Sequence, residues 1–174
     1  MTSAKQRKGL YTAVVLAVAA ERLAELRVAK RNEKTVRALG AVEAGQGHYP
    51  PMVALHTGLL LGCLAEVHLT DRPWSPKLGR SMLATLGAAQ ALRWWCIRTL
   101  GPQWNTKILV VPDAPLVDRG PYRVLDHPNY VAVVAEGFAL PLAHSAWMTA
   151  GAFSALNAAL LRVRIRAEDR ALRR

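Results

Sequence analysis

The sequence predicts an all-α integral membrane protein with about five transmembrane helices, the last two of which form a helical hairpin. Three observations lead to this prediction. The chain of 174 residues is 52% apolar, too high a share for a disordered basic tail, and its apolar residues come in long blocks with few charges. Lysine and arginine gather where these blocks end. The length fits a single domain over 1–174, and no alternating strand pattern competes with the helices.

The first three apolar blocks each match one membrane crossing. Residues 9–29 form the first block, with its charges in the second half. Residues 51–69 form the second, with Glu66 near its end, and residues 78–97 form the third. A helix that crosses a bilayer needs ~20 apolar residues. Each block therefore predicts one transmembrane helix.

The fourth block, residues 130–161, contains one charged residue, Glu136. It is too long for one crossing and short for two. Pro141, followed closely by small and polar residues, indicates a tight turn near the middle of the block, so we expect a hairpin of two spans. A soluble helical bundle is the alternative, since buried core helices can show similar blocks.

The charge indicates which side of the membrane each end faces. A formal net charge of +11, from 23 Lys and Arg against 12 Asp and Glu, excludes an ordinary acidic cytosolic enzyme and suggests a polyanionic neighbour. The basic residues concentrate in 27–37, 98–123 and 162–174, which a five-span topology places on one side. The positive-inside rule makes that side cytoplasmic. No nucleic-acid-binding signature accompanies the charge, so we expect these residues to contact membrane lipid and not nucleic acid.

Metal and nucleotide motifs are missing from the sequence. Cys63 and Cys96 lie in or at the edge of apolar spans, and the histidines show no HExxH or HxxxH spacing. We therefore predict neither a disulfide framework nor a metal site. No glycine-rich turn follows a strand, which argues against a Rossmann-type nucleotide pocket.

The segment between the third and fourth spans ends in a motif that suits ligand binding. Asp126-His127-Pro128-Asn129-Tyr130 directly precedes the fourth span. Proline suits the first position of a helix, with His127 or Asp126 as its cap. The start of a helix presents free N–H groups that can hold a carboxylate or a phosphate. A simple helix cap at the membrane surface is the alternative interpretation.

A second motif follows the fifth span. Arg164 and Glu168 are four residues apart and so share a helix face, where a surface ion pair is the plainer interpretation. Because spans four and five form a hairpin, this helix returns to the surface that carries His127. We therefore expect residues 98–130 and 162–174 to form a ligand pocket on the cytoplasmic side, with Trp104, Tyr122 and Tyr130 in its walls.

Charged and polar side chains within the spans need a partner or a function. Glu21, Arg22 and Glu25 are expected to pair between helices or to lie near the interface. Glu66 and His56 could pair internally in the same way.

Two further residues are candidates for contact with a substrate. Glu136 lies on the face of the fourth span that continues from Asn129, although pairing with Arg93 or with the first helix is an equal alternative. His48 enters the second span from the cytoplasmic side and could reach the pocket.

The combined motifs resemble those of a known family. LVDRGPYRVLDHPNY, followed by a hairpin and RIRAED, resembles the isoprenylcysteine carboxyl methyltransferase family of integral-membrane methyltransferases. Within it, RNEK…GAVEAGQGHYPPMVALH and LGPQWNTKILVVP resemble a bacterial branch that methylates lipidic polyketides such as alkylpyrones and alkylresorcinols. The family usually has arginine before the His-Pro pair, and this chain has Asp126.

The resemblance implies a methyltransferase that uses S-adenosylmethionine at the cytoplasmic face of a bacterial plasma membrane. Its acceptor would be a lipophilic small molecule, methylated on a carboxylate, enol or phenol oxygen. Arg164 and Glu168 would be the catalytic residues, with Arg164 facing the substrate. Matched by position to the family motif, the cofactor-binding residues would be Lys107, Ala114, Pro115, Leu116, Val117, Tyr122, His127, Pro128, Asn129, Tyr130 and Glu168.

These residue types suit the chemistry that the resemblance implies. A sulfonium is a cation that the ring faces of Tyr122 or Tyr130 can attract. An acceptor that is already ionised needs Arg164 to position it and needs no strong base. A neutral phenol needs a base, for which Glu168 and His127 are candidates.

Two alternatives stay open at this point. The first is the same fold acting on a prenylated cysteine carboxylate or on a phospholipid amine. The second is a non-catalytic membrane module whose basic face recruits partners or anionic lipid.

Overall fold

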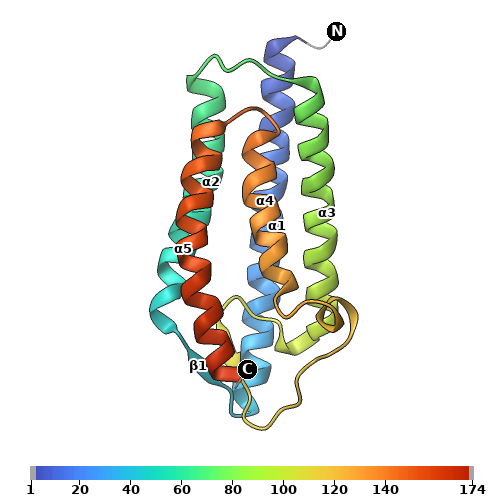
Figure 1. Ribbon diagram of the computed structural model, residues 1–174, viewed down its shortest axis with the longest axis vertical. Coiled ribbons are helices and arrows are strands. Elements are labelled where there is room, and N and C mark those ends of the chain that lie inside the picture. Colours follow the sequence, from blue (N-terminus) through green and yellow to red (C-terminus); the bar gives the residue numbers. More distant parts are fainter. Residues whose placement is uncertain (1–2, 173–174) are drawn as a thin grey trace.

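Five α-helices make up most of the chain in a computed structural model that describes residues 3–172 (Figure 1). Arg173 and Arg174, part of the segment predicted to form the pocket, lie outside the described residues. The helices are α1 (Ala4–Ala38), α2 (Tyr49–Leu69), α3 (Pro76–Leu100), α4 (Pro128–Leu142) and α5 (Trp147–Leu172). The predicted all-α class is confirmed, and each predicted span falls within one of these helices.

The helix starts follow from local sequence. Ser3 accepts a hydrogen bond from the Gln6 backbone, and the Gln6 side chain accepts one from the Ser3 backbone, which is a capping box for α1. Ser75 caps α3, with proline at the next position, and Pro128 begins α4. Proline suits these positions because the first N–H groups of a helix have no partner within it.

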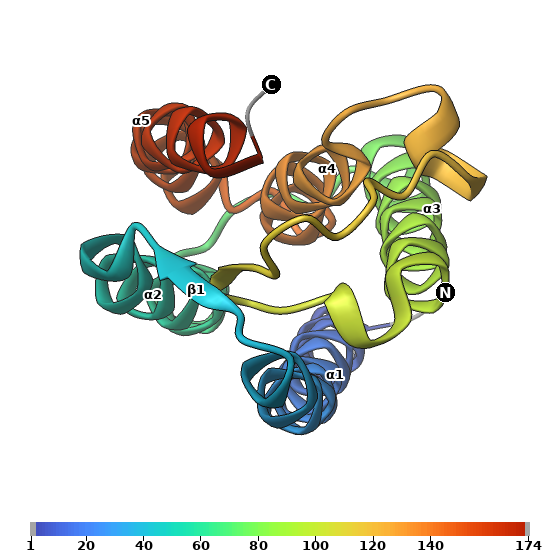
Figure 2. The ribbon, with the colours of Figure 1, turned by 90° about the horizontal axis from the view of Figure 1, so that it is seen from below.

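The helices run alternately up and down around a central space. Seen from the end that holds β1, they follow one another in the order α1, α2, α5, α4 and α3 (Figure 2). α4 packs against both α3 and α5, and α2 packs against α1 and α5. The C-terminal end of α5 and the loops before α2 and α4 therefore meet at the same end of the bundle (Figure 1).

The predicted hairpin between the last two helices is present. α4 ends at Leu142 and α5 begins at Trp147, with Ser145 in the left-handed region at φ 58°. Glu66 of α2 fixes the start of α5, because its carboxylate accepts hydrogen bonds from the backbone N–H groups of Met148 (3.1 Å) and Thr149 (2.8 Å). Glu66 thus pairs with another helix, as the sequence analysis allowed, and acts as the cap of α5.

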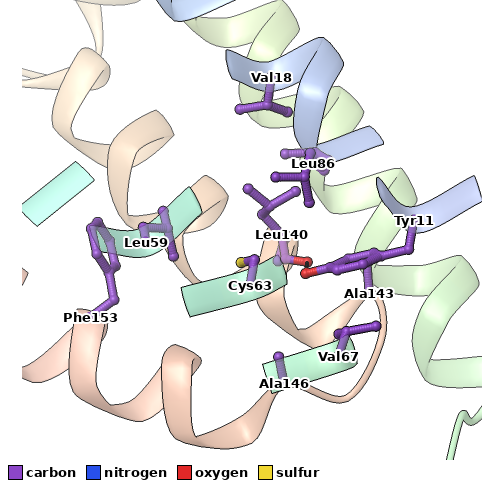
Figure 3. Close-up of a cluster of buried hydrophobic side chains, with 12 residues drawn as sticks. Tyr11, Val18, Leu59, Cys63, Val67, Leu86, Leu140, Ala143, Ala146 and Phe153 are labelled. Atoms are coloured by element: carbon purple, nitrogen blue, oxygen red, sulfur yellow. Dashed lines mark hydrogen bonds between the residues drawn. The ribbon is translucent and has the colours of Figure 1, made fainter. Parts of the chain in front are cut away.

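An apolar core fills the half of the bundle that contains the hairpin turn (Figure 3). Every helix contributes to it, and the Tyr11 hydroxyl donates a hydrogen bond to the carbonyl oxygen of Leu140 (3.1 Å). The buried members are Tyr11, Val15, Val18, Leu59, Cys63, Val67, Leu86, Ala139, Leu140, Ala143, Ala146 and Phe153. This packing leaves the cavity described below in the other half of the bundle.

A buried ionic network joins α1, α3 and α4 near mid-length. The Glu136 carboxylate accepts hydrogen bonds from Arg22 (2.8 Å) and Arg93 (2.6 Å), and Arg22 also binds Glu25 (2.6 Å). Glu136 and Arg93 are each 3% exposed, so these charges depend on one another for compensation. Of the two pairings open to Glu136 in the sequence, with Arg93 or with the first helix, the structure contains both.

A small antiparallel sheet, which the sequence did not predict, lies at the cavity end of the bundle. β1 (Val42–Ala44) pairs with β2 (Ile108–Val110), with Val42 opposite Val110. Three residues per strand are too few to produce a recognisable alternating pattern. Three short 3₁₀ segments complete the connections: η1 (Gln46–His48), η2 (Gly101–Gln103) and η3 (Gly120–Arg123).

By length and composition, one helix of the described range, Gln46–Leu69, is apolar enough to cross a membrane. α4 is short at 15 residues, and α1, α3 and α5 carry more charge along their length. Large apolar side chains are nevertheless exposed on all five helices. They include Leu10, Leu16, Leu23, Leu61, Leu69, Leu83, Trp95, Val131, Val134, Phe138, Met148, Leu156 and Val163.

The close approach of α4 to α5 yields a stability prediction. A Cβ atom on Gly137 would lie 2.0 Å from Cε1 of the Phe153 ring, which is buried in the core. We expect Gly137→Ala to destabilise the protein by about 1–3 kcal/mol through overpacking. Thermal unfolding in detergent micelles measures the effect.

Gly151→Ala is the matched control, because nothing lies within 4 Å of a Cβ at Gly151 in α5. It should leave stability unchanged or raise it by roughly 0.5–1 kcal/mol. Equal unfolding temperatures for the two variants would contradict the tight packing described for Gly137.

Candidate active site at the loop end of the bundle

A cavity of about 460 Å³ opens inside the bundle at its loop end. Its walls come from all five helices and from the long segment between α3 and α4. Sites for small molecules in proteins commonly have this volume. The apolar core at the hairpin end and the ionic network at mid-length bound the space along the bundle axis.

Most residues that the sequence singled out lie in the wall of this one cavity. Its lining includes Lys107, Ala114, Pro115, Leu116, Val117, Tyr122, His127, Asn129, Tyr130, Arg164 and Glu168. Pro128 is buried as the first residue of α4 and does not line the cavity. Asp126, at the position where the family has arginine, lines it as well.

The two residues predicted to contact substrate from other elements lie outside the lining. His48 ends η1, and its ring packs close to Gly45. Glu136 is held by Arg22 and Arg93 in the ionic network. The structure therefore gives Glu136 a role in joining helices.

The start of α4 is fastened to the end of α5 by polar contacts. His127 Nε2 lies 2.9 Å from Asp169 Oδ1, and His127 Nδ1 lies 3.8 Å from Glu168 Oε1. The Tyr130 hydroxyl donates to Glu168 Oε2 (2.5 Å), and the Tyr130 ring stacks against that of His127. Carboxylates and aromatic faces thus meet at one corner of the cavity. Asp169 belongs to the quoted RIRAED motif, but the sequence analysis gave it no role.

Arg164 is a buried cation without a charged partner. It is 5% exposed, and one guanidinium nitrogen donates to the Thr106 carbonyl oxygen (2.9 Å). Its Nε has no hydrogen-bond partner, and among residues 3–172 it forms no ion pair. Glu168, four residues further along, accepts a hydrogen bond from Tyr130. The surface ion pair between Arg164 and Glu168, the plainer interpretation of the sequence, is not formed. A buried charge in this state is poised to receive an anionic group.

Lys107 links the loop after α3 to α1 and β1. Its Nζ lies 3.0 Å from Glu33 Oε1 and 3.9 Å from Glu43 Oε2, and it sits over the Tyr49 ring. The hydrogen bond from Lys107 lowers the pKa of Glu33 below its ordinary value, which keeps the pair ionised. Lys107 therefore shapes the cavity wall besides lining it.

Tyr122 and Asn129 add neutral polar groups to the wall. Burial raises the pKa of Tyr122 well above its usual range, so its hydroxyl stays protonated. The Asn129 side-chain oxygen is buried without a hydrogen-bond partner. A bound molecule with a hydrogen-bond donor would satisfy Asn129.

The deeper part of the cavity contains residues to which the sequence analysis assigned no ligand. They are Arg22, Glu25, His56, Arg93 and Asn157. The first four were recognised only as residues that pair between helices. Asn157 was missed, although it is a polar residue in an otherwise apolar stretch and lies two turns before Arg164 on the same helix.

The fold and the cavity together define a class of protein: a helical bundle with an internal cavity lined by a buried cation, carboxylates and aromatic rings. A model of the isoprenylcysteine carboxyl methyltransferase (ICMT) family matches residues 82–174, more than half of the chain. The protein belongs to this family. Family membership implies a membrane methyltransferase.

Two bacterial proteins are similar over nearly the full length. Uncharacterized protein YpbQ of Bacillus subtilis is 43% identical over 164 residues, which cover 94% of this chain and 96% of the relative. An uncharacterized protein of Haemophilus influenzae is 26% identical over 161 residues, which cover 92% and 91%. No solved structure is significantly similar to the chain.

Substitutions of the two buried arginines, Arg93 and Arg164, test which of the two charges stabilises the folded protein. Arg93→Met removes ion pairs to Glu25 and Glu136 and should cost about 3–5 kcal/mol of stability. Arg164→Met removes an uncompensated charge and one hydrogen bond to a carbonyl, so ligand-free stability should fall by less than about 1 kcal/mol or rise. Thermal unfolding of both variants in micelles measures the difference. Similar losses would show that Arg164 is needed for folding rather than for a ligand.

Proposed function

We propose that this protein transfers a methyl group from S-adenosylmethionine to an oxygen of a lipophilic small molecule. The observation that carries the proposal is Arg164, a buried cation without an ion pair. It lies in the cavity that also contains Tyr130, His127 and Glu168, within a chain of a methyltransferase family. A cation in that position suits a carboxylate, enol or phenol oxygen that is, or becomes, negatively charged.

The residues of the cavity fit S-adenosylmethionine. The volume suits a nucleoside-sized molecule, and Trp104 Nε1 and Asn129 Oδ1 are buried polar atoms without partners. Tyr122 and Tyr130 offer ring faces for a sulfonium cation. Glu168 offers a carboxylate for the methionine ammonium or a ribose hydroxyl, and the α4 start offers N–H groups for the methionine carboxylate.

Within this proposal the chain positions the reactants and excludes water. When bound, S-adenosylmethionine supplies a methyl group activated by the sulfonium charge. His127, Asn129 and the 114–117 segment form the wall that holds it, and Arg164 orients the acceptor oxygen. Methyl transfer is an in-line displacement, so alignment and desolvation are its main requirements.

The exposed apolar side chains support a location in the membrane. All five helices present them, more than a water-exposed bundle usually shows. We propose that all five helices cross or enter the bilayer of a bacterial plasma membrane. The basic segments 27–37, 98–123 and 162–172 lie at the loop end, which by the positive-inside rule faces the cytoplasm. The cavity then opens at that side.

Arg164 also helps to rank the acceptors. Its positive charge attracts an oxygen anion and repels an ammonium, which disfavours a phospholipid amine. Among oxygen acceptors, the resemblance to polyketide-methylating proteins favours alkylpyrones and alkylresorcinols over a prenylated cysteine carboxylate. A non-catalytic membrane module is disfavoured because it does not require a buried, unpaired arginine in a cavity.

The test compares Arg164→Ala with Arg162→Ala, an exposed arginine on the same helix. Isothermal titration with S-adenosylmethionine in micelles should show binding to the wild type and to both variants. Methyl transfer to alkylpyrone, alkylresorcinol and prenylcysteine is then measured side by side. We expect Arg164→Ala to lower kcat/KM by roughly 100-fold, with Arg162→Ala unchanged. Failure of the wild type to bind S-adenosylmethionine would refute the proposed function.

A further inference from the structure

The deep end of the cavity contains two polar side chains that the roles above do not use. His56 of α2 and Asn157 of α5 both line it. They lie on facing helices: the Phe153 ring, one turn before Asn157, packs edge-on against the His56 ring with centroids 5.3 Å apart. Both side chains therefore belong to neighbouring parts of the cavity wall.

The hydrogen bond of His56 determines which ring nitrogen can accept a proton. Nδ1 lies 2.9 Å from the Met52 carbonyl oxygen. A carbonyl oxygen only accepts hydrogen bonds, so Nδ1 carries the hydrogen. In the neutral imidazole, Nε2 then holds the lone pair, and no side chain among residues 3–172 forms a hydrogen bond with it.

Asn157 presents a second acceptor. Its side chain is 3% exposed, and its Oδ1 has no hydrogen-bond partner within the described residues. A buried, unpaired amide oxygen is unfavourable until a donor reaches it. Two acceptors, His56 Nε2 and Asn157 Oδ1, thus belong to side chains that line the same cavity. A neutral hydroxyl group can donate its one hydrogen to either acceptor, whereas a carboxylate, which only accepts, can donate to neither.

The charged groups around this end are occupied with one another. Arg22 and Glu25 come from α1, Arg93 from α3 and Glu136 from α4, and they form the ionic network. α5 contributes no charge beside His56 at this level, where Phe153 and Asn157 lie. Both carboxylates of this network are therefore ion-paired with arginine, and Glu25 Oε1, which accepts no hydrogen bond from the described residues, lies 3.4 Å from Arg93 Nε.

The bases considered at the loop end are engaged as well. His127 Nε2 is 2.9 Å from a carboxylate oxygen of Asp169, which only accepts, so this nitrogen carries a hydrogen. Glu168 accepts the Tyr130 hydroxyl. The other ring nitrogen of His127, Nδ1, lies 3.8 Å from Glu168 Oε1, whereas His56 Nε2 forms no ion pair within residues 3–172.

We propose that His56 and Asn157 bind a neutral hydroxyl acceptor, a lipophilic phenol, and that His56 Nε2 takes its proton during methyl transfer. The hydroxyl oxygen forms a bond to the methyl carbon while the sulfur–methyl bond breaks and leaves its electron pair on sulfur. The hydroxyl proton passes to Nε2 and then to water. Arg164 stabilises the oxygen as it becomes negative. This inference rests on the proposed methyl transfer and narrows its substrate class.

The experiment compares an acceptor that must lose a proton with one that is already ionised. Wild type, His56→Gln and Asn157→Ala are assayed in micelles with alkylresorcinol, a neutral phenol, and with alkylpyrone, an acidic enol. We expect His56→Gln to lower kcat/KM for alkylresorcinol by about 10²–10⁴-fold and for alkylpyrone by less than about tenfold. Asn157→Ala should weaken alkylresorcinol binding, measured without S-adenosylmethionine, by about 3–10-fold.

His68→Gln is the matched control, because His68 is on the same helix and bonds to Thr12 at the opposite end of the bundle. It should leave both acceptors unaffected. The inference is overturned if His56→Gln slows both acceptors equally, if it slows neither, or if the wild type methylates alkylpyrone alone. Wild-type protein that methylates no acceptor would instead count against the proposed function. If His56→Gln does not fold, as judged by S-adenosylmethionine binding, an unchanged alkylresorcinol affinity in Asn157→Ala overturns the inference.

Discussion

The contact of Glu136 with two arginines is the constraint on which the arrangement of the bundle depends. One carboxylate on α4 binds Arg22 of α1 and Arg93 of α3, so three helices are held at one level by charges that cannot be left unpaired. Toward the hairpin turn, the helices close on an apolar core (Figure 3). Toward the loops they enclose the cavity. The network thus separates a half that provides stability from a half that provides a binding site.

Two buried arginines, Arg93 and Arg164, line the cavity but differ in the groups that they contact. Arg93 is paired with the carboxylates of Glu25 and Glu136, whereas Arg164 lines the cavity and donates to a backbone carbonyl oxygen. A buried charge without a partner lowers the stability of the fold. Such a charge is tolerated where a bound ligand compensates it. Both arginines are buried, but only Arg164 lacks a carboxylate partner among the described residues, and for this reason the proposed methyl transfer is assigned to the loop end of the bundle.

Much of the fold could be predicted from the sequence, because charge-free blocks and proline at helix starts are local signals. The convergence of His127, Tyr130, Arg164 and Glu168 also followed once the hairpin was recognised. The β1–β2 pairing could not be predicted, since three-residue strands leave no periodic pattern. The cap that Glu66 provides and the orientation of His56 were equally out of reach, because both depend on which faces of α2 and α5 meet. Asn157 did leave a signal, as a polar residue in an apolar stretch.

The cap on α5 has a mechanical consequence. Glu66 fixes the helix at Thr149, and Glu168 lies nineteen residues further along, roughly 28 Å away at the rise of an α-helix. Because α5 is fixed at its start, a small tilt of the helix displaces its far end by a larger distance. The loop end of α5 forms three polar links, with His127, Tyr130 and Thr106, and also packs against β1, β2 and η1. Those links therefore set the distance between the two walls of the cavity, and exchanging them for contacts to a ligand would change its width without disturbing the core.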